Sequence, residues 1–222
     1  MKRHLLFLAA LLIVNLAASA QKKFSVYAVG FYNQENLFDT CHDEGKKDYE
    51  YLPNKGWNGM KYTNKLRNMS KALADMGTDV LPNVGCAFIG LAEVENHKVL
   101  DALVDQAPLK ARNMKYVHIE GPDRRGIDCA LLYNPSLFSV KNVKLLPYVQ
   151  ELAKDSAYFT RGFLTVRGEM AGDDVAVIVC HWPSRFSGPF YRESAARQVK
   201  VIKDSLLNVN QEMKIFVMGD MN

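Results

Sequence analysis

Side chains able to hold a divalent cation or a phosphate follow four of the eight strands predicted for this 222-residue chain. They are Asn33, Glu35 and Asn36 after the first strand, Glu93 and Glu95 after the second, His181 after the seventh, and Asp220 and Asn222 after the eighth. Carboxylate and amide oxygens are hard ligands, which suit Mg²⁺, Mn²⁺ or Ca²⁺ rather than zinc. Because sites in α/β proteins assemble at the carboxyl ends of strands, the pattern predicts one site built from several strand ends.

The elements that must position these residues alternate between strands and helices. Apolar and β-branched runs predict strands over residues 24–32, 87–92, 114–119, 127–133, 137–146, 163–170, 175–180 and 214–218. Apolar residues recur at spacings of three and four along residues 62–76, 99–104 and 195–206, which predicts three amphipathic helices. The composition, 48% hydrophobic and 23% charged, is that of a globular protein and excludes a collagen-like or disordered chain. We therefore predict a single α/β domain with mixed sheets.

Residues 1–20 have the pattern of a secretory signal peptide. A basic start at residues 2–4 is followed by an apolar run over residues 5–16 and by small residues up to Ala20. The apolar run is too short for a comfortable membrane span. We expect cleavage near Ala20, which leaves a domain over residues 21–222 that is exported to the periplasm or secreted and has no stable membrane anchor.

Five motifs occur along the chain in an order known from one superfamily. They are residues 32–39 (YNQENLFD), 90–96 (GLAEVEN), 125–133 (RGIDCALLY), 181–185 (HWPSR) and 219–222 (GDMN). The set resembles the endonuclease/exonuclease/phosphatase superfamily, which includes deoxyribonucleases of the pancreatic type and exonuclease III-like AP endonucleases. It is most similar to the exported bacterial branch. The resemblance implies a four-layer α/β sandwich with two mixed β-sheets flanked by helices.

The resemblance also implies a role for each residue that matches a motif. Glu93 matches the metal-binding glutamate, and Asn33 matches the first-strand asparagine that orients metal and phosphate. His181 lies where the deoxyribonuclease-like members have a histidine that supports the scissile phosphate. In the last motif, Asp220 matches the aspartate that aligns the attacking water, and Asn222 matches the asparagine that holds the phosphate.

These residue types suit the hydrolysis of a phosphodiester, with Mg²⁺ as the expected cofactor and Mn²⁺ or Ca²⁺ as alternatives. Glu93 supplies hard negative charge for the cation, and Asp220 is able to orient or deprotonate water. A protonated His181 would donate to the phosphoryl group, and the ordinary titration of histidine near neutral pH suits that use. Arg185 offers a bidentate fork for a phosphate.

Three further candidates, Glu35, Arg125 and Asp128, lie in the same motifs. Asp128 has an alternative role as the partner of Arg125 or Arg161 in a structural ion pair. Glu95 is expected to favour the start of the helix that follows it rather than to take part in chemistry.

The expected partner is a nucleic acid or another phosphodiester substrate, bound by a monomer. DNA or RNA is the first expectation, and a lipid or sugar phosphoester is the alternative because the same core serves all of them. Without Lys2 and Arg3 the formal net charge falls from +4 to +2, which is low for a strong DNA binder.

Members of the superfamily complete their catalytic set with a carboxy-terminal segment that carries an Asp and then an Asp-His pair. Residues 1–222 contain no counterpart of that segment, so the domain is expected to be truncated at the carboxy terminus. A non-catalytic binding module is therefore an alternative function. Of the four cysteines, Cys129 and Cys180 lie in apolar runs and are expected in the core, and the spacings predict no metal site.

Overall fold

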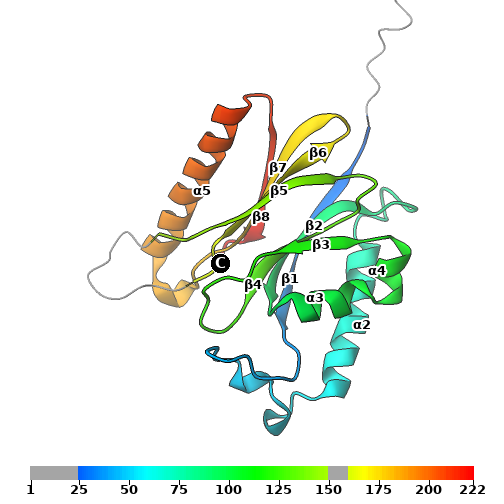
Figure 1. The fold of residues 1–222 in the computed structure, drawn as a ribbon, viewed down its shortest axis with the longest axis vertical. Helices are drawn as coiled ribbons and strands as arrows, with labels where there is room; N and C mark the ends of the chain where they lie inside the picture. The colour runs from blue at the N-terminus through cyan, green and yellow to red at the C-terminus, as the bar shows by residue number, and fades with distance from the viewer. Residues whose placement is uncertain (1–24, 150–159) are drawn as a thin grey trace, which may run out of the picture.

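Two four-stranded sheets pack face to face in the structure, a computed structural model that describes residues 25–149 and 160–222 (Figure 1). The first sheet has the order β1 (Ala28–Leu37), β2 (Cys86–Val94), β4 (Asp128–Tyr133) and β3 (Lys115–His118). β1 is parallel to β2, whereas β4 is antiparallel to both β2 and β3. The first sheet is therefore mixed.

The second sheet has the order β5 (Ser139–Leu146), β6 (Phe163–Met170), β7 (Asp173–His181) and β8 (Lys214–Asp220). β5, β6 and β7 are antiparallel to one another, and β8 runs parallel to β7. This sheet is mixed as well. The predicted fold class, an α/β sandwich with two mixed sheets flanked by helices, is confirmed.

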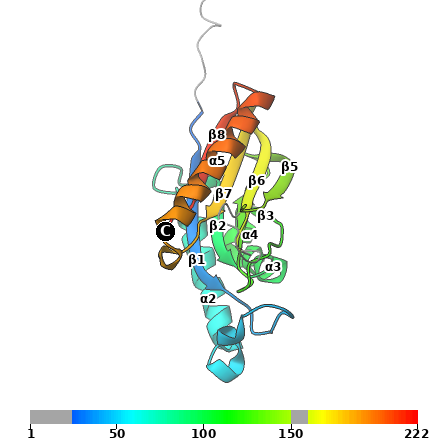
Figure 2. The ribbon, with the colours of Figure 1, turned by 90° about the vertical axis from the view of Figure 1, so that its left-hand side faces the viewer.

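Helices cover the outer face of each sheet. α2 (Gly59–Asp75), α3 (His97–Val104) and α4 (Ala107–Ala111) pack on the first sheet, and α5 (Pro189–Val209) packs on the second (Figure 1). Figure 2 shows α5 lying along the second sheet. Three 3-10 helices, Tyr49–Tyr51, Pro53–Lys55 and Arg185–Ser187, lie in the connections.

The core between the two sheets is formed by the inward-facing residues of their strands. Phe88 of β2 contacts the rings of Phe138 and Phe216, with centroids 5.2 and 5.4 Å away. Gly90 lies on the same strand, and a Cβ there would be 2.7 Å from the sulfur of Met218 in β8. The side chains of the second sheet therefore pack closely against the backbone of β2 at Gly90, three residues before Glu93.

The predicted strands and helices are present, with differences at their ends. β1 continues past residue 32 to Leu37, so Asn33 and Glu35 lie within the strand and not after it. The extension is irregular: Glu35 and Asn36 have φ of +51° and +62°, and the register with β2 shifts there. α5 starts at Pro189, six residues before the predicted start, because proline suits the first turn of a helix.

All four cysteines lie in the described residues and are free thiols, and Cys129 and Cys180 are buried as predicted. The predicted signal peptide, residues 1–20, and the cleavage point near Ala20 lie outside the described residues. Within residues 25–149 and 160–222, every helix is too short or too polar to cross a bilayer.

Candidate active site

Two contacts join the carboxyl ends of strands from different sheets. Asn33 of β1 donates from Nδ2 to Oδ2 of Asp220 in β8, at 2.9 Å. Nε2 of His181 in β7 lies 3.7 Å from Oε1 of Glu93 in β2. His181 and Asp220 are also paired in register between β7 and β8. Four residues predicted from separate motifs therefore meet in one place between the sheets.

The backbone at Glu93 departs from regular strand geometry. Its φ is +60°, and the pairing of β2 with β4 shifts in register between Ala92 and Val94. A left-handed conformation costs a residue with a side chain roughly 1–2 kcal/mol, and such positions cluster at functional sites. The irregular end of β2 holds the Glu93 carboxylate beside His181 of the other sheet.

The last motif forms a turn that holds Asp220 as an ionised carboxylate. Gly219 has φ of +156°, and a side chain there would collide with the carbonyl oxygen of Cys180, so this position requires glycine. Asp220 Oδ1 accepts from the backbone N–H of Asn222 at 2.9 Å. Burial acts to raise the pKa of Asp220, but the hydrogen bonds from Asn222 and Asn33 outweigh it and the pKa is lowered. Asp220 is thus a stable hydrogen-bond acceptor and a weak base.

His181 is neutral in this environment. Its side chain is 4% exposed, and burial followed by the Arg161 guanidinium lowers the pKa of the imidazole to about 3. The lowered pKa disfavours the protonated form in which His181 would donate as a cation near neutral pH. A neutral imidazole still carries one N–H that is able to donate to a phosphate oxygen.

An ion pair that the sequence patterns did not single out braces the site. Arg161 donates from Nη1 to Oδ2 of Asp123 at 3.1 Å and from Nη2 to the carbonyl oxygen of Trp182 at 2.9 Å. The two charged side chains are 9% and 6% exposed. Asn222 Nδ2 donates to the same Trp182 oxygen at 2.9 Å. The buried arginine therefore fixes the loop after His181 and, through it, the asparagine of the last motif.

Asp128 belongs to a different buried network. Its carboxylate lies 3.2 Å from Nε2 of His118 and accepts from the N–H of Gly121 at 3.0 Å. The suggested ion pair of Asp128 with Arg125 or Arg161 is therefore wrong, since Arg161 pairs with Asp123. Asp128 holds the connection between β3 and β4.

The other three candidates, Glu35, Arg185 and Arg125, are exposed to solvent. Glu35 is exposed, and its backbone N–H donates to Oδ1 of Asn33 at 2.8 Å, so it helps to orient that side chain. Arg185 is exposed at the start of the 3-10 helix after β7. Arg125 is exposed as well, and its charge contributes to the lowered pKa of His181.

Glu95 does more than favour a helix start. Asn96 caps α3, accepting from two backbone N–H groups, at Lys98 and Val99. Glu95 instead accepts from the N–H of Asp39 at 2.8 Å, and burial raises the pKa of its carboxyl to about 8. The residue ties the end of β1 to the end of β2.

The groups of the site that could bind a metal ion are mainly carboxylate and amide oxygens. In the described part of the chain, no three His, Cys, Asp or Glu side chains gather as ligands of a metal ion. Mg²⁺ commonly keeps several waters and takes only one or two carboxylates from the protein. Glu93, with the amide of Asn33 and the carboxylate of Asp220 nearby, fits that ion and does not fit the nitrogen and sulfur sets of zinc.

The profile of the Endonuclease/Exonuclease/phosphatase family matches residues 28–222 of this chain. The chain belongs to that family. The search of curated proteins found no significant match.

Similar solved structures include ANGEL2, described as a 2′,3′-cyclic phosphatase, at 14% identity and a TM-score of 0.57, covering 87% of this chain and 52% of that chain. The complex of ANGEL2 with adenosine-2′,3′-vanadate gives 13% identity and a TM-score of 0.57, covering 88% and 53%. Truncated TDP2 from Caenorhabditis elegans gives 17% identity and a TM-score of 0.51, covering 72% and 57%. At these identities the likeness shows the fold alone. The chain spans about half the length of these solved chains.

Proposed function

We propose that the chain is part of an exported, metal-dependent phosphodiester hydrolase whose substrate is a nucleic acid. The observation that carries the proposal is the meeting of Asn33 with Asp220 and of Glu93 with His181 between the two sheets. Both contacts bring together side chains of the types that bind cations or phosphates, close to the strand ends where α/β folds build their sites, which supports the proposal.

Glu93 and Asn33 are the residues that would hold the cation. When bound, Mg²⁺ supplies positive charge that neutralises the non-bridging phosphate oxygens. Oδ1 of Asn33 already accepts from Glu35, and its Nδ2 donates to Asp220, so its orientation is fixed by the protein. Mn²⁺ or Ca²⁺ would satisfy the same oxygen donors.

Asp220 and His181 act on the reacting groups in different ways. Asp220, ionised and fixed by two hydrogen bonds, orients the attacking water by accepting a hydrogen bond from it. His181, neutral and buried, donates its N–H to a phosphate oxygen as negative charge develops there. Nδ2 of Asn222 donates to the carbonyl oxygen of Trp182, which fixes the amide side chain. In this position the Asn222 side chain would hold the phosphate.

Two exposed arginines from the sequence motifs support a substrate with several phosphates. Arg185 and Arg125 are both exposed and supply candidate contacts to flanking phosphates. Family membership and the shared fold support a phosphoester substrate, and ANGEL2 with this fold is described as a cyclic phosphatase. A lipid or sugar phosphoester is the second candidate, since a formal net charge of +4, or +2 without Lys2 and Arg3, is low for a protein that binds a polyanion strongly.

Export is proposed from the first twenty residues, whose basic start, apolar run and small residues before Ala20 form a signal-peptide pattern. Mass spectrometry of the protein recovered outside the cytoplasm tests it. A mature chain that starts at Gln21 is expected, and full-length protein retained in the cytoplasm would contradict export.

A substrate panel tests the hydrolase proposal. Plasmid DNA, RNA, sphingomyelin and a phosphomonoester are each incubated with the protein, with Mg²⁺ or with a chelator. We expect nicking of nucleic acid that requires Mg²⁺ and is lost in Glu93→Gln and Asp220→Asn. Glu169→Gln, which changes an exposed ion pair with Lys141, is the matched control and should remain active.

Each of the other outcomes would lead to a different conclusion about the function. Lipid cleavage without nicking of DNA or RNA would replace the nucleic-acid proposal with a lipid phosphodiesterase. Binding of Mg²⁺ and a nucleotide without turnover of any substrate would support the non-catalytic binding module. Equal activity in Glu93→Gln and wild type would show that the site is assigned to the wrong residues.

A further inference from the structure

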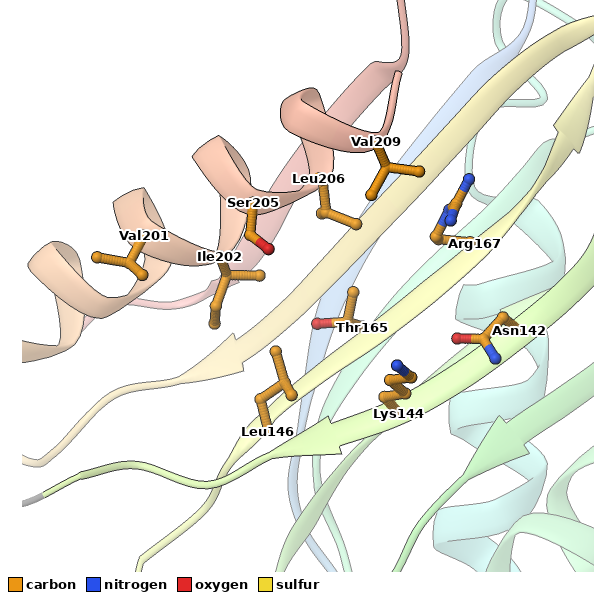
Figure 3. A pocket seen from close by; sticks show the side chains of 10 residues that line it. All are labelled: Asn142, Lys144, Leu146, Thr165, Arg167, Val201, Ile202, Ser205, Leu206 and Val209. Carbon is orange, nitrogen blue, oxygen red and sulfur yellow. The ribbon is translucent and has the colours of Figure 1, made fainter. Parts of the chain in front are cut away.

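A groove lies between α5 and the outer face of β5 and β6 (Figure 3). It consists of two adjoining hollows of about 350 and 210 Å³, which share Leu146, Val201 and Ile202. Cross-strand pairs form its floor: Asn142 with Arg167, Lys144 with Thr165, and Leu146 with Phe163. Successive pairs are two residues apart, so the floor extends about 13 Å from Arg167 to Phe163. We call this feature the α5 groove.

The α5 groove changes in polarity along its length. The smaller hollow is walled by apolar groups such as Phe163, Pro147 and Val149. The larger hollow adds the cations Lys144 and Arg167 and the hydroxyl of Thr165. Among the described residues that line the two hollows, none is acidic. The charge at the polar end therefore favours an anion, and the other end favours an alkyl or aryl group.

Two polar atoms at the charged end are buried without a hydrogen-bond partner in the structure: Thr165 Oγ1 and Arg167 Nε. Thr165 is 6% exposed, and its neighbours Leu164 and Val166 face the core between the sheets, so its own side chain faces α5. Leaving a buried hydroxyl without a hydrogen-bond partner is unfavourable. A ligand oxygen at this point would accept from it.

The apolar wall on α5 is also left open to solvent. Val201 is 67% exposed and Val209 is 64% exposed. In Figure 3 the side chains of Val201, Ile202 and Leu206 line the helix side, opposite Leu146 and Thr165 on the sheet. Arg167 is partly neutralised by Asp174 at 3.0 Å, which leaves Lys144 as the main cation for a ligand.

We propose that the α5 groove binds a single-chain amphiphile with a carboxylate head, of the medium-chain fatty acid type. The carboxylate contacts Lys144 and accepts from Thr165, and the alkyl chain runs over Leu146 and Ile202 toward Phe163. The groove lies on the outer face of the second sheet, away from the strand ends that carry Glu93 and Asp220, so this proposal stands apart from the hydrolase.

Calorimetric titration of the full 222-residue chain with octanoate, below its micelle-forming concentration, tests the proposal. Octan-1-ol, which has the same chain and no charge, is titrated in parallel. We expect octanoate to bind roughly tenfold more tightly than the alcohol, since a charged hydrogen bond is stronger than a neutral one. Amide NMR shifts should map to residues 144–146 and 163–167.

Two variants and a control make the test specific. Thr165→Val keeps the shape and removes the unpaired hydroxyl, so it should weaken octanoate binding about three- to tenfold without lowering Tm. Lys144→Gln should reduce octanoate affinity to that of the alcohol. Lys141→Gln is the control: it also removes one positive charge from β5, but Lys141 pairs with Glu169 outside the α5 groove. This variant should bind octanoate like the wild type.

Several results would overturn the proposal. Equal affinities for octanoate and octan-1-ol would show that the cations do not contribute. Wild-type affinity in both Thr165→Val and Lys144→Gln, shifts that map elsewhere, or no binding by either probe would exclude this ligand class. Self-association that Lys144→Gln abolishes would assign the α5 groove to a second copy of the chain.

Discussion

Replacing Asp123 by asparagine is expected to destabilise the fold by roughly 3–5 kcal/mol, the usual effect of removing one partner of a buried ion pair. The Arg161 and Asp123 side chains are 9% and 6% exposed, so solvent does not compensate the guanidinium when the carboxylate is lost. Arg161 keeps one bond, from Nη2 to the Trp182 carbonyl at 2.9 Å. Because Trp182 also holds Asn222, the variant should lose hydrolysis as well as stability.

Urea denaturation at neutral pH, followed by circular dichroism, measures the change in the free energy of unfolding. Glu169→Gln is the matched control, because it breaks an ion pair with Lys141 whose side chains are 57% and 47% exposed. An exposed pair contributes less than about 1 kcal/mol, so the control should unfold near the wild-type midpoint.

A double-mutant cycle with Arg161→Met separates the pair from its surroundings. The change in the double variant should be smaller than the sum of the single changes by several kcal/mol, because the second substitution removes the uncompensated charge. If Asp123→Asn were no less stable than Glu169→Gln, or if the single changes were additive, the bracing role of the Arg161–Asp123 pair would be refuted.

Three other predictions follow from single positions. Glu93→Gly should raise the free energy of unfolding, measured in urea, by up to about 1 kcal/mol, because the φ of +60° at this position is unfavourable for a residue with a side chain. Glu93→Gln should give no such gain, and both variants should lose hydrolysis. In chelator-treated protein, His181 should stay neutral from about pH 5 upward, because burial lowers its pKa to about 3; an NMR titration with a midpoint near 6.5 would contradict this. Since that folded-state pKa lies below the unfolded value, the stability from the neutral imidazole is complete above about pH 6.5 and declines as the pH falls toward 3. Gly90→Ala should destabilise by roughly 1–3 kcal/mol, because its Cβ would lie 2.7 Å from the sulfur of Met218, whereas Gly59→Ala, in open space, should leave Tm unchanged.

Helices and strands were predictable where the spacing of apolar residues within the segment itself determines which face is buried. The apolar spacing over residues 62–76 corresponds to α2 (Gly59–Asp75), and the apolar run over residues 175–180 corresponds to β7. The same locality explains why Asn33, Glu93, His181 and Asp220 could be proposed from strand ends. His181 and Asp220 end their strands, Glu93 is one residue from the end of β2, and Asn33 lies inside the extended β1; the two sheets then bring the four together.

Features that depend on distant contacts were not predictable. Arg161 and Asp123 are 38 residues apart, and their pairing follows from how the connections of the two sheets pack. The neutral state of His181 depends on burial by both sheets, which no sequence pattern records. The extension of β1 through Glu35 uses positive φ at a residue with a side chain, against the local preference. The sequence patterns therefore singled out residues that the fold brings together, but not the electrostatics around them.

We propose that a divalent cation binds where Asn33 of β1, Glu93 of β2, His181 of β7 and Asp220 of β8 meet. Titration of the metal-free protein with Mn²⁺, read as paramagnetic broadening of amide NMR signals, tests it most directly. We predict that broadening starts at Glu93, Asn33 and Asp220 and that Glu93→Gln weakens it, whereas Glu169→Gln does not. Broadening centred elsewhere, or unchanged in Glu93→Gln, would contradict the account.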